Sequence, residues 1–560
     1  MSIAPSATPA GVAPTWTTGS TEVFKTGTWR ASLARHVHAP SPCHQACPVG
    51  GDIAEWIGHA RAGDWRGAWE VLTRHNPFPA IAGRICHHPC ETACNRKGYD
   101  EAVSICKLER AAGDRALAQR WGFAPPAAER AGRVAVVGGG PAGLSAAFQL
   151  RRRGWQVTLF ESSAALGGLM RHGIPSYRLA REVLDAEIAR IVALGVDVKL
   201  GAAVDSPQAL AALRESHDAV FVATGAARPK RLPQLAPDGV RVLDGAAYLA
   251  ACSAGASPAL GPRVIVIGGG SAAMDAARSA RRAGHAVTVL ALESRDQMPA
   301  QREELDEALE EGITLADGAM LQRLEPAPDG LRLHCTRVRF ERGDAPGRFR
   351  VEAVEGSGFA IAADAVLVSI GADADLTPFD GVVAADGALL AAGRDGATGA
   401  DGVWAGGDVA SMARFVTEAV GMGKRAALSI DRRLRADAGE DLGAAAADEG
   451  APVPLASIAT WYHGHAARAA APTLAPELRL RDGAEVQLGL EVEQALAEAV
   501  RCFSCGSCTA CDNCVTVCPD LAVSRAPGGG YLVSLDYCKG CGLCVRECPT
   551  GSMRMEEEAR

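Results

Sequence analysis

The sequence predicts a multidomain protein. Two Rossmann-like α/β nucleotide-binding domains, one inserted in the other, are expected between a helical N-terminal domain and a small α+β C-terminal domain. Two observations support this prediction. A strand, a glycine-rich turn, a helix and a second strand occur in that order twice, near residues 133–161 and 263–293. All but two of the 18 cysteines lie in two groups, one toward each end of the 560 residues. This length is typical of three to four domains.

The composition excludes several classes of partner. The formal net charge is −8 and no basic stripe is present, so we expect no nucleic-acid partner. No apolar run approaches the roughly 18 residues of a membrane span, and residues 1–20 lack the apolar core of a signal peptide. We therefore expect a cytoplasmic protein with no membrane partner. In that compartment, closely spaced cysteines indicate metal sites rather than disulfides.

The first glycine-rich unit starts as a buried strand, RVAVV, and continues as G-x-G-x-x-G at Gly138, Gly140 and Gly143. The first glycine allows a tight turn, the second lets the backbone approach a pyrophosphate, and the third lets the helix pack on the sheet. The next strand ends in Glu161, at the distance expected of a ribose ligand. We predict a dinucleotide site here; a glycine-rich turn in another kind of α/β unit is the alternative.

The second unit repeats this pattern at Gly268, Gly270 and Ala273, with alanine in the third place. The chain therefore contains an internal repeat of one nucleotide-binding unit. Two such sites predict FAD at the first and a nicotinamide nucleotide at the second. The similar segments 218–225 and 364–371, DAVFVATG and DAVLVSIG, are expected where the chain leaves and re-enters the flavin domain.

The N-terminal cysteines are separated by patterns typical of amphipathic helices. A small helical module has little core of its own, so thiolate ligation of a metal would help to fix its fold. An iron–sulfur site is favoured by the neighbouring flavin pattern, and a structural zinc site is the alternative. The members of this group are Cys43, Cys47, Cys86, Cys90, Cys94 and Cys106.

The C-terminal cysteines form two copies of C-x-x-C-x-x-C-x-x-x-C-P and resemble those of bacterial two-cluster ferredoxins. The resemblance implies two 4Fe-4S clusters, with the fourth cysteine of each copy crossing to the other cluster. The implied ligands of one cluster are Cys508, Cys511, Cys514 and Cys548. Those of the other are Cys538, Cys541, Cys544 and Cys518.

Residues 40–435 resemble the small subunit of glutamate synthase and the front half of dihydropyrimidine dehydrogenase. The matching segments are CHQACP, NPFPAIAGRIC, CETAC, VSICKLER, the first glycine unit, GGLMRHGIPSYRL, GGGSAAMDAAR and GGDVA. The resemblance implies that Gly168, Leu169 and Arg178 contact the flavin ring. It also implies that Asp408, which follows a strand, binds the ribityl chain.

One departure from this family concerns the first cluster. The family has a Cys-x-x-Cys shortly before Cys43, where this chain has Arg35 and His38. The resemblance still assigns Cys47, Cys86 and Cys90 to one cluster, with Cys106 or Glu109 as its fourth ligand. Cys43 and Cys94 then belong to a second cluster that needs two more ligands. We hypothesise that Cys502 and Cys505, which lie just ahead of the ferredoxin-like module, supply them.

The nucleotide preference can be argued from the end of the second strand of the repeat. Relatives that use NADPH have Tyr-Arg-Arg here, whereas this chain has Ala-Leu-Glu at 291–293. The Glu293 carboxylate would repel a 2′-phosphate and accept bonds from a free 2′-hydroxyl. We therefore predict NADH in preference to NADPH, while Arg295 and the pair Arg281 and Arg282 leave NADPH open.

These parts together predict an NAD(P)H:ferredoxin or acceptor oxidoreductase, acting as the electron-transfer subunit of a larger complex. Flavin exchanges hydride with nicotinamide and single electrons with 4Fe-4S clusters, so no catalytic side chain is required. A partner of 2-oxoacid oxidoreductase type, or a free ferredoxin, is expected because no motif for carbon chemistry is present. The glutamate synthase small subunit is the alternative setting.

Two other classes were weighed against this prediction. Disulfide reductases also pair FAD with nicotinamide, but they need a redox cysteine pair near the flavin. Neither nucleotide-binding domain has one. A non-catalytic scaffold that keeps its cofactors for folding is the remaining alternative. The predicted domains are a flexible arm (1–30), the helical 4Fe-4S domain (31–125), the FAD domain (126–245 and 372–435), the NAD(P) domain (246–371), a linker (436–495) and the ferredoxin domain (496–560).

Overall fold

The computed structural model describes residues 25–235, 241–344, 348–443, 450–481 and 483–558. Most of the predicted flexible arm lies outside these residues. The chain divides into two compact units. The small unit comprises Met1–Ser41, Glu449–Gly464 and Phe503–Arg560, and the main unit comprises Pro42–Asp448 and His465–Cys502.

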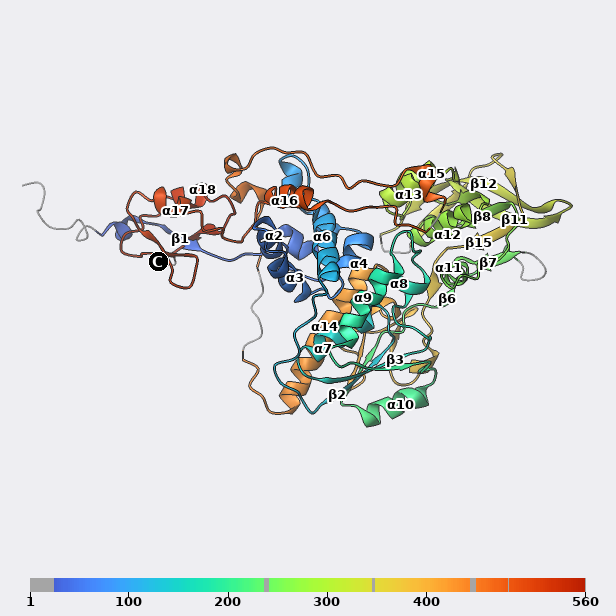
Figure 1. The fold of residues 1–560 in the computed structure, drawn as a ribbon, viewed down its shortest axis with the longest axis horizontal. Helices are drawn as coiled ribbons and strands as arrows, with labels where there is room; N and C mark the ends of the chain where they lie inside the picture. Colours follow the sequence, from blue (N-terminus) through green and yellow to red (C-terminus); the bar gives the residue numbers. More distant parts are fainter. Residues whose placement is uncertain (1–24, 236–240, 345–347, 444–449, 482, 559–560) are drawn as a thin grey trace, which may run out of the picture. The chain divides into compact units, whose positions relative to one another are not determined.

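The first nucleotide-binding domain of the main unit is a five-stranded parallel sheet with helices on both faces (Figure 1). Alternate residues of β2 (Arg133–Val137) face opposite sides of the sheet, because successive side chains of a strand point in opposite directions. Val134 and Val136 pack against one set of helices, and Ala135 and Val137 against the other. The strand order is β19 (Val403–Ala405), β5 (Ala219–Val222), β2 (Arg133–Val137), β3 (Gln156–Glu161) and β4 (Asp197–Leu200). The helices are α7 (Pro141–Arg151), α9 (Arg181–Val192) and α14 (Val416–Asp437) on the first face and α10 (Pro207–Ser216) on the second.

The second nucleotide-binding domain repeats this plan and is inserted between β5 and β19, as predicted. Val264 and Val266 pack under helices, whereas Ile265 and Ile267 face an antiparallel sheet. The parallel strands, in order, are β10 (Thr314–Ala316), β9 (Ala286–Leu290), β8 (Arg263–Ile267), β15 (Ala365–Val368) and β7 (Val242–Asp244). The helices are α11 (Gly245–Ser253), α12 (Ser271–Arg282) and α13 (Arg302–Glu310). The antiparallel strands are β11 (Ala319–Ala327), β12 (Gly330–Arg342), β13 (Phe349–Ala353) and β14 (Phe359–Ala363).

The chain passes between these two domains twice, and the two passages form a short antiparallel pair. The pair joins β6 (Arg228–Pro229) to β16 (Ala372–Asp373). After it, β17 (Ala385–Asp386) and β18 (Leu389–Leu390) form a small hairpin before the chain returns to β19. The two covalent connections to the inserted domain therefore lie side by side.

The N-terminal part of the main unit is helical, as predicted. Glycine is required where two helices of this part touch. A Cβ on Gly83 would lie 2.3 Å from the backbone nitrogen of Arg110, and one on Gly113 would lie 2.3 Å from the backbone nitrogen of Ala80. The contact joins α4 to α6 backbone to backbone. The helices are α1 (Pro42–Ala46), α2 (Ile53–Arg61), α3 (Trp65–Thr73), α4 (Pro79–Ile85), α5 (Pro89–Thr92) and α6 (Ile105–Ala118).

The segment His465–Cys502, most of which the sequence analysis treats as a linker, packs along the main unit (Figure 1). It contains α15 (Pro476–Arg479) and α16 (Val492–Val500). The Glu485 carboxylate accepts hydrogen bonds from Arg84 and Arg110 of the helical domain and from the Ala180 N–H of the flavin domain. Gln487 donates to Glu307 of the inserted domain at 2.6 Å. This strap therefore contacts all three parts of the main unit.

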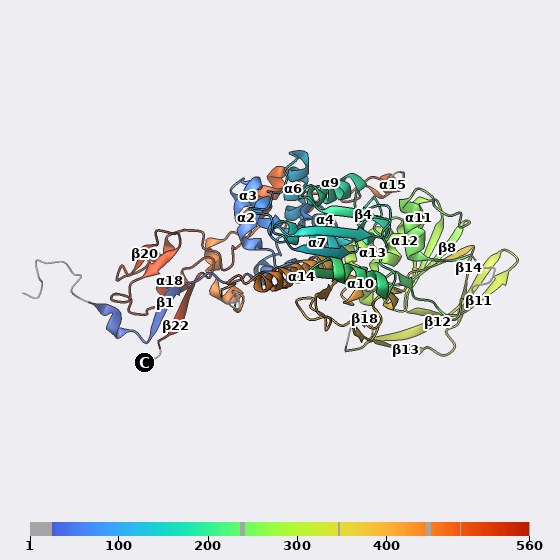
Figure 2. The ribbon, with the colours of Figure 1, turned by 90° about the horizontal axis from the view of Figure 1, so that it is seen from below.

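The small unit is a ferredoxin-type fold with an added N-terminal strand (Figure 2). That strand, β1 (Ser32–His36), pairs antiparallel with β22 (Met553–Glu557), so residues expected in the helical domain belong to the C-terminal domain's sheet. The other elements are α17 (Asn513–Thr516), β20 (Val523–Arg525), β21 (Tyr531–Val533) and α18 (Leu543–Arg546). Among the helices of the described residues, none combines the length and apolar character that crossing a membrane requires.

Candidate functional site

The first glycine turn has two glycines that the fold itself requires. Gly138 has φ +105°, and a Cβ there would lie 2.3 Å from the Ala223 carbonyl oxygen. A Cβ on Gly143 would lie 1.9 Å from the Gly138 carbonyl oxygen. Side chains at these positions would collide with backbone, so both glycines serve the turn and the packing of α7 on β2.

Gly140 is different, because the fold does not require it to be glycine. Its backbone angles, φ −79° and ψ −172°, suit any residue, and a Cβ there would have only the Gly168 Cα, at 3.9 Å, within 4 Å. The missing side chain leaves open space directly in front of the N-terminus of α7. A dinucleotide's pyrophosphate fits this space, because the helix N–H groups and dipole favour an anion there.

Glu161 and the loop at Gly168 frame this space. The Glu161 carboxylate accepts bonds from the Gly139 N–H at 2.8 Å and the Ser163 N–H at 2.7 Å, and its side chain is buried. Gly168 packs over Gly140 so closely that its own Cβ would lie 2.8 Å from the Gly140 Cα. Leu169, the first residue of α8 (Leu169–His172), is exposed beside this loop. The flavin-site residues of the sequence analysis, apart from Arg178 and Asp408, thus surround one turn.

Asp408 lies in the 3-10 turn Gly407–Val409, which packs against the start of α7. A Cβ on Gly407 would be 3.1 Å from the Ala142 Cβ. Burial raises the pKa of Asp408, and nearby Arg414 acts in the opposite direction. A half-buried carboxylate at this place fits the ribityl hydroxyls of a flavin bound at the Gly140 space, since hydroxyl donors would compensate its burial.

Arg178 has partners that the resemblance did not imply. Its guanidinium donates to Asp275 at 2.6 Å and to Glu304, which lie on α12 and α13 of the inserted domain. Burial acts to lower the pKa of Arg178, but the two carboxylates hold it above its ordinary value. Burial raises the pKa of Asp275 to about 6, against the opposing effect of Arg178. Arg178 therefore ties the flavin domain to the inserted domain through a buried ion triad.

The second glycine turn reproduces the geometry of the first. Gly268 has φ +139°, and a Cβ there would lie 2.3 Å from the Ser369 carbonyl oxygen. Gly270 has ordinary angles, φ −93° and ψ 172°, and a Cβ there would meet no atom within 4 Å. Ala273, in the first turn of α12, is fully buried. A second open space thus faces the N-terminus of α12, and it fits a second dinucleotide.

Glu293 occupies in this turn the place that Glu161 occupies in the first. Its Oε2 lies 2.7 Å from the position of a Cβ on Gly269. Arg281, Arg282 and Arg295, which the sequence analysis considered as possible ligands of the NADPH 2′-phosphate, have partners within the protein. Arg295 pairs with Asp306 at 2.9 Å, and Arg282 pairs with Glu311 at 2.6 Å. Arg281 donates to the Glu311 carbonyl oxygen at 2.9 Å.

Cys47, Cys86 and Cys90 form one centre in the helical domain. Burial, Glu109 and Cys47 together raise the pKa of the Cys86 thiol to about 12. Burial also raises the pKa of Cys90, with Cys47 and Cys86 adding to the effect. Thiols that disfavour one another's ionisation in this way are converted to thiolates when a cation binds among them.

The two candidates for the fourth ligand of this centre, Cys106 and Glu109, have different hydrogen-bond partners. The Cys106 Sγ lies 3.3 Å from the Gly83 carbonyl oxygen and 3.6 Å from that of Ala82, in the bend that ends α4. The Glu109 carboxyl faces Cys47 and Cys86 and accepts a bond from Asn76 at 2.8 Å. Burial raises the pKa of Glu109 to about 8. Cys106 and Glu109 both lie near Cys86, and Glu109 also lies near Cys47, so Glu109 is close to two thiols of this centre.

Helix α14 packs both beside this centre and on the flavin cradle, by which we mean the first glycine turn with Glu161 and the Gly168 loop. The sequence analysis did not predict this double contact. A Cβ on Gly421 of α14 would lie 2.2 Å from the Pro48 carbonyl oxygen, next to Cys47. A Cβ on Gly423, two residues on, would lie 2.1 Å from the Ala142 carbonyl oxygen in the first turn of α7. At the start of α14, Thr417 contacts the Cys86 Sγ at 3.7 Å. The motif GMG would have been the sequence indication of this double contact.

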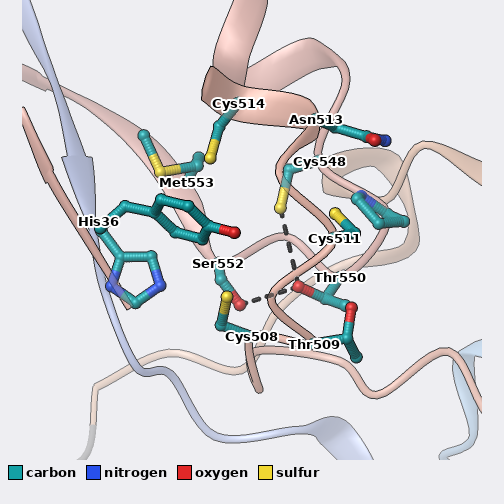
Figure 3. Close-up of a pocket in the computed structure, with 12 residues that line it drawn as sticks. His36, Cys508, Thr509, Cys511, Asn513, Cys514, Cys548, Thr550, Ser552 and Met553 are labelled. Atoms are coloured by element: carbon teal, nitrogen blue, oxygen red, sulfur yellow. Dashed lines mark hydrogen bonds between the residues drawn. The ribbon is translucent and has the colours of Figure 1, made fainter. Parts of the chain in front are cut away.

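Four of the C-terminal cysteines of the small unit surround a small hollow that is partly open to solvent (Figure 3). The thiols that line it are those of Cys508, Cys511, Cys514 and Cys548. Burial raises the pKa of Cys544 to about 11, and Cys538, Cys518 and Cys541 add to this effect. The structure thus brings together both sets that the resemblance implied. Among the described residues, no three His, Cys, Asp or Glu side chains converge as ligands of a single metal ion do.

Cys43, Cys94 and Cys502 belong to the main unit and share one apolar cluster of the helical domain. Cys505 is buried in the small unit. The two remaining cysteines are apart from both groups: Cys335 is buried in β12, and Cys252 lies half-buried in α11. In the part of the chain that the structure describes, no cysteine takes part in a disulfide.

Three family models match successive parts of the chain. A family model described as pyridine nucleotide-disulphide oxidoreductase matches residues 132–423. A model described as dihydropyrimidine dehydrogenase domain II, 4Fe-4S cluster, matches residues 34–121. A model described as a 4Fe-4S dicluster domain matches residues 507–553.

Three curated relatives show the range of similar proteins. The beta subunit of an NADP(+)-dependent formate dehydrogenase from Moorella thermoacetica is 33% identical over 511 residues, which cover 85% of this chain and 72% of the relative. The NAD-dependent dihydropyrimidine dehydrogenase subunit PreT of Escherichia coli is 30% identical, covering 70% of this chain and 91% of the relative. The glutamate synthase [NADPH] small chain of Azospirillum brasilense is 32% identical, covering 71% and 87%.

Proposed function

Because the chain belongs to the pyridine nucleotide-disulphide oxidoreductase family, we propose that it is the electron-transfer subunit of a larger redox complex. It moves electrons between NAD(P)H, held at the Gly270 space, and a ferredoxin or partner subunit. The observation that carries this proposal is the double contact of α14. Its Gly421 packs on the Pro48 carbonyl, next to Cys47, and its Gly423 packs on Ala142 in the first turn of α7. The contact gives single electrons a short route between the two sites.

The residues of the chain hold and orient the cofactors. A bound flavin supplies the conversion between hydride transfer and single-electron transfer. Gly140 and the α7 N-terminus hold the pyrophosphate, Glu161 the ribose and Asp408 the ribityl chain. Cys47, Cys86, Cys90 and Glu109 ligate the cluster nearest the flavin, and the two cysteine sets of the small unit ligate two more 4Fe-4S clusters. The matches to two 4Fe-4S family models support clusters over the zinc alternative.

The proposed nucleotide is NADH. The Glu293 carboxylate lies at the second glycine turn, where a 2′-phosphate would meet like charge. Arg295 and Arg282 are paired with carboxylates, so neither is available as a phosphate ligand without losing an ion pair. The relatives' names include both NAD- and NADP-dependent enzymes, so family membership alone does not choose between the nucleotides.

The proposed partner performs the carbon chemistry. We favour a 2-oxoacid:acceptor oxidoreductase type of complex, or a free ferredoxin, because the dicluster domain extends the chain beyond the region that resembles glutamate synthase. A glutamate synthase complex is the second candidate, supported by the similarity to the Azospirillum small chain. The formate dehydrogenase relative is likewise named as a subunit, which supports an assembly over an independent enzyme.

Anaerobic titration of the full-length chain, reconstituted with FAD, iron and sulfide, tests the proposal. We expect NADH to bleach both the flavin and the cluster absorbance, with a higher kcat/KM for NADH than for NADPH in a dye-reduction assay. A protein that retains no flavin, or whose clusters stay oxidised with either nucleotide, would overturn the proposed function and favour the scaffold alternative. A higher kcat/KM for NADPH would overturn the nucleotide preference alone.

A further inference from the structure

The first observation concerns the chain before Cys43. The resemblance places two cluster cysteines there, but residues 32–36 form β1 and are paired residue by residue with β22. Arg35 lies opposite Arg554 and forms an ion pair with Glu556 at 2.5 Å. This segment is paired within the sheet of the small unit, and the sequence holds no cysteine before Cys43.

The second observation concerns what enters that cluster instead. Helix α16 packs against α2 and α6 through Ala495 and Ala499, both fully buried. Small residues at this spacing let the helix approach closely. Two residues beyond its end, Cys502 is 9% exposed and joins the apolar cluster that contains Cys43, which is 8% exposed. Cys94 packs against the same cluster.

The third observation is a buried network that aligns Cys94 with Cys502. The Arg96 guanidinium donates to the Arg501 carbonyl oxygen at 2.6 Å and pairs with Asp100 at 2.7 Å. Arg501 pairs with the same Asp100 at 3.2 Å. Arg96 is two residues after Cys94, and Arg501 is the residue before Cys502. Burying two guanidiniums is costly unless their partners are well placed, so this network fixes the two cysteine-bearing segments side by side.

We propose that Cys43, Cys94 and Cys502 are thiolate ligands of a further 4Fe-4S cluster in the helical domain. It is distinct from the centre of Cys47, Cys86, Cys90 and Glu109. The inference rests on the proposed function, because it adds a cluster to that electron route. Each thiol gives up its proton to solvent as it binds iron, and the iron and sulfide come from solution. A strap residue, distant in sequence from the domain, thereby takes over a position that the domain's own N-terminal segment does not fill.

Iron and acid-labile sulfide counts on the reconstituted full-length chain test this inference. We expect Cys502→Ser, Cys43→Ser and Cys94→Ser each to lose about four irons and four sulfides per chain, as one 4Fe-4S cluster holds. The double variant Cys43→Ser, Cys502→Ser should lose no more than either single variant, because both residues serve one cluster. Cys252→Ser, which replaces a half-buried cysteine outside both groups, is the matched control and should lose none.

The remaining outcomes separate this inference from the proposed function. If Cys502→Ser keeps the full iron count, or if the losses in the double variant add, the inference is wrong. Electron paramagnetic resonance of dithionite-reduced samples gives a second readout, in which the single variants should lack one and the same signal. Flavin content and bleaching by NADH in the wild-type chain test the proposed function independently.

Discussion

Replacing Gly270 by alanine separates the two reasons for which a glycine can be required. The backbone angles at Gly270 suit alanine, and the added Cβ would meet no protein atom within 4 Å. The fold therefore carries no steric penalty. The loss of a glycine's freedom in the unfolded chain should stabilise the variant by about 0.4–1 kcal/mol. Melting of the inserted domain should be unchanged or slightly higher in temperature.

The same methyl group occupies the space that we assign to the nicotinamide nucleotide's pyrophosphate. Displacing the phosphate from one backbone N–H of α12 should cost about 1.5–3 kcal/mol, the value of a hydrogen bond to a charged group. At 1.4 kcal/mol per tenfold, the Kd for NADH should rise by roughly 10- to 150-fold. The flavin content should stay at the wild-type level, since Gly140 and its cradle are untouched.

The assay combines differential scanning fluorimetry with NADH titration of the flavin absorbance. Gly140→Ala is the counterpart, and it should lose FAD while keeping its fold. Gly143→Ala is the contrast, because its Cβ would lie 1.9 Å from the Gly138 carbonyl oxygen, and it should destabilise the flavin domain. A Gly270→Ala variant with normal NADH affinity, or one with a lower melting temperature, would refute the assignment of the open space to a nucleotide.

Three further predictions follow from buried or site-facing charges. Glu293→Ser should raise kcat/KM for NADPH about tenfold, because a like charge near the 2′-phosphate is removed; an unchanged ratio of NADPH to NADH efficiency would contradict this. Arg178→Met should lower the free energy of unfolding by about 3–5 kcal/mol, because Asp275 and Glu304 lose their cation. Adding Asp275→Asn and Glu304→Gln to this variant should restore most of the loss. Urea unfolding measures both effects. Burial raises the pKa of Glu187 to about 7 from 4.5, so the folded state binds this proton more tightly than the unfolded state does. The contribution of protonated Glu187 to folding stability is fully present below pH 4.5 and is lost as the pH rises through 7. Glu187→Gln should therefore gain in melting temperature relative to wild type between pH 5 and 8, and a constant difference across that range would disprove the effect.

The parts of the fold that the sequence predicts are those encoded in short contiguous stretches. Each nucleotide cradle is specified by about 30 residues, in which the strand, turn, helix and acidic residue follow one another. The cysteine copies near the C-terminus are local in the same way. The insertion of one domain in the other followed from the repeat and from the two similar strands that bracket it.

The parts that escaped prediction depend on residues far apart in the chain. Nothing in the pattern of residues 32–36 shows that their partner is β22, because a five-residue strand carries little register information. The described residues of the strap contain only two short helices, and its contacts with the other parts of the main unit include ion pairs such as that of Glu485 with Arg84. Arg178 was assigned by resemblance to the flavin, whereas its partners lie on helices about 100 residues later. Pairings of buried charges follow from the tertiary arrangement, which a local reading does not contain.

The pairing of β1 with β22 also sets an order of events during synthesis. His36 lies opposite Met553, so β1 cannot pair with its neighbour until the roughly 500 residues between the two strands have been synthesised. At about 5–20 residues per second, that delay is on the order of half a minute to two minutes. Both nucleotide-binding domains can be complete long before then. The sheet that contains β1 is consequently completed only after both nucleotide-binding domains have been synthesised.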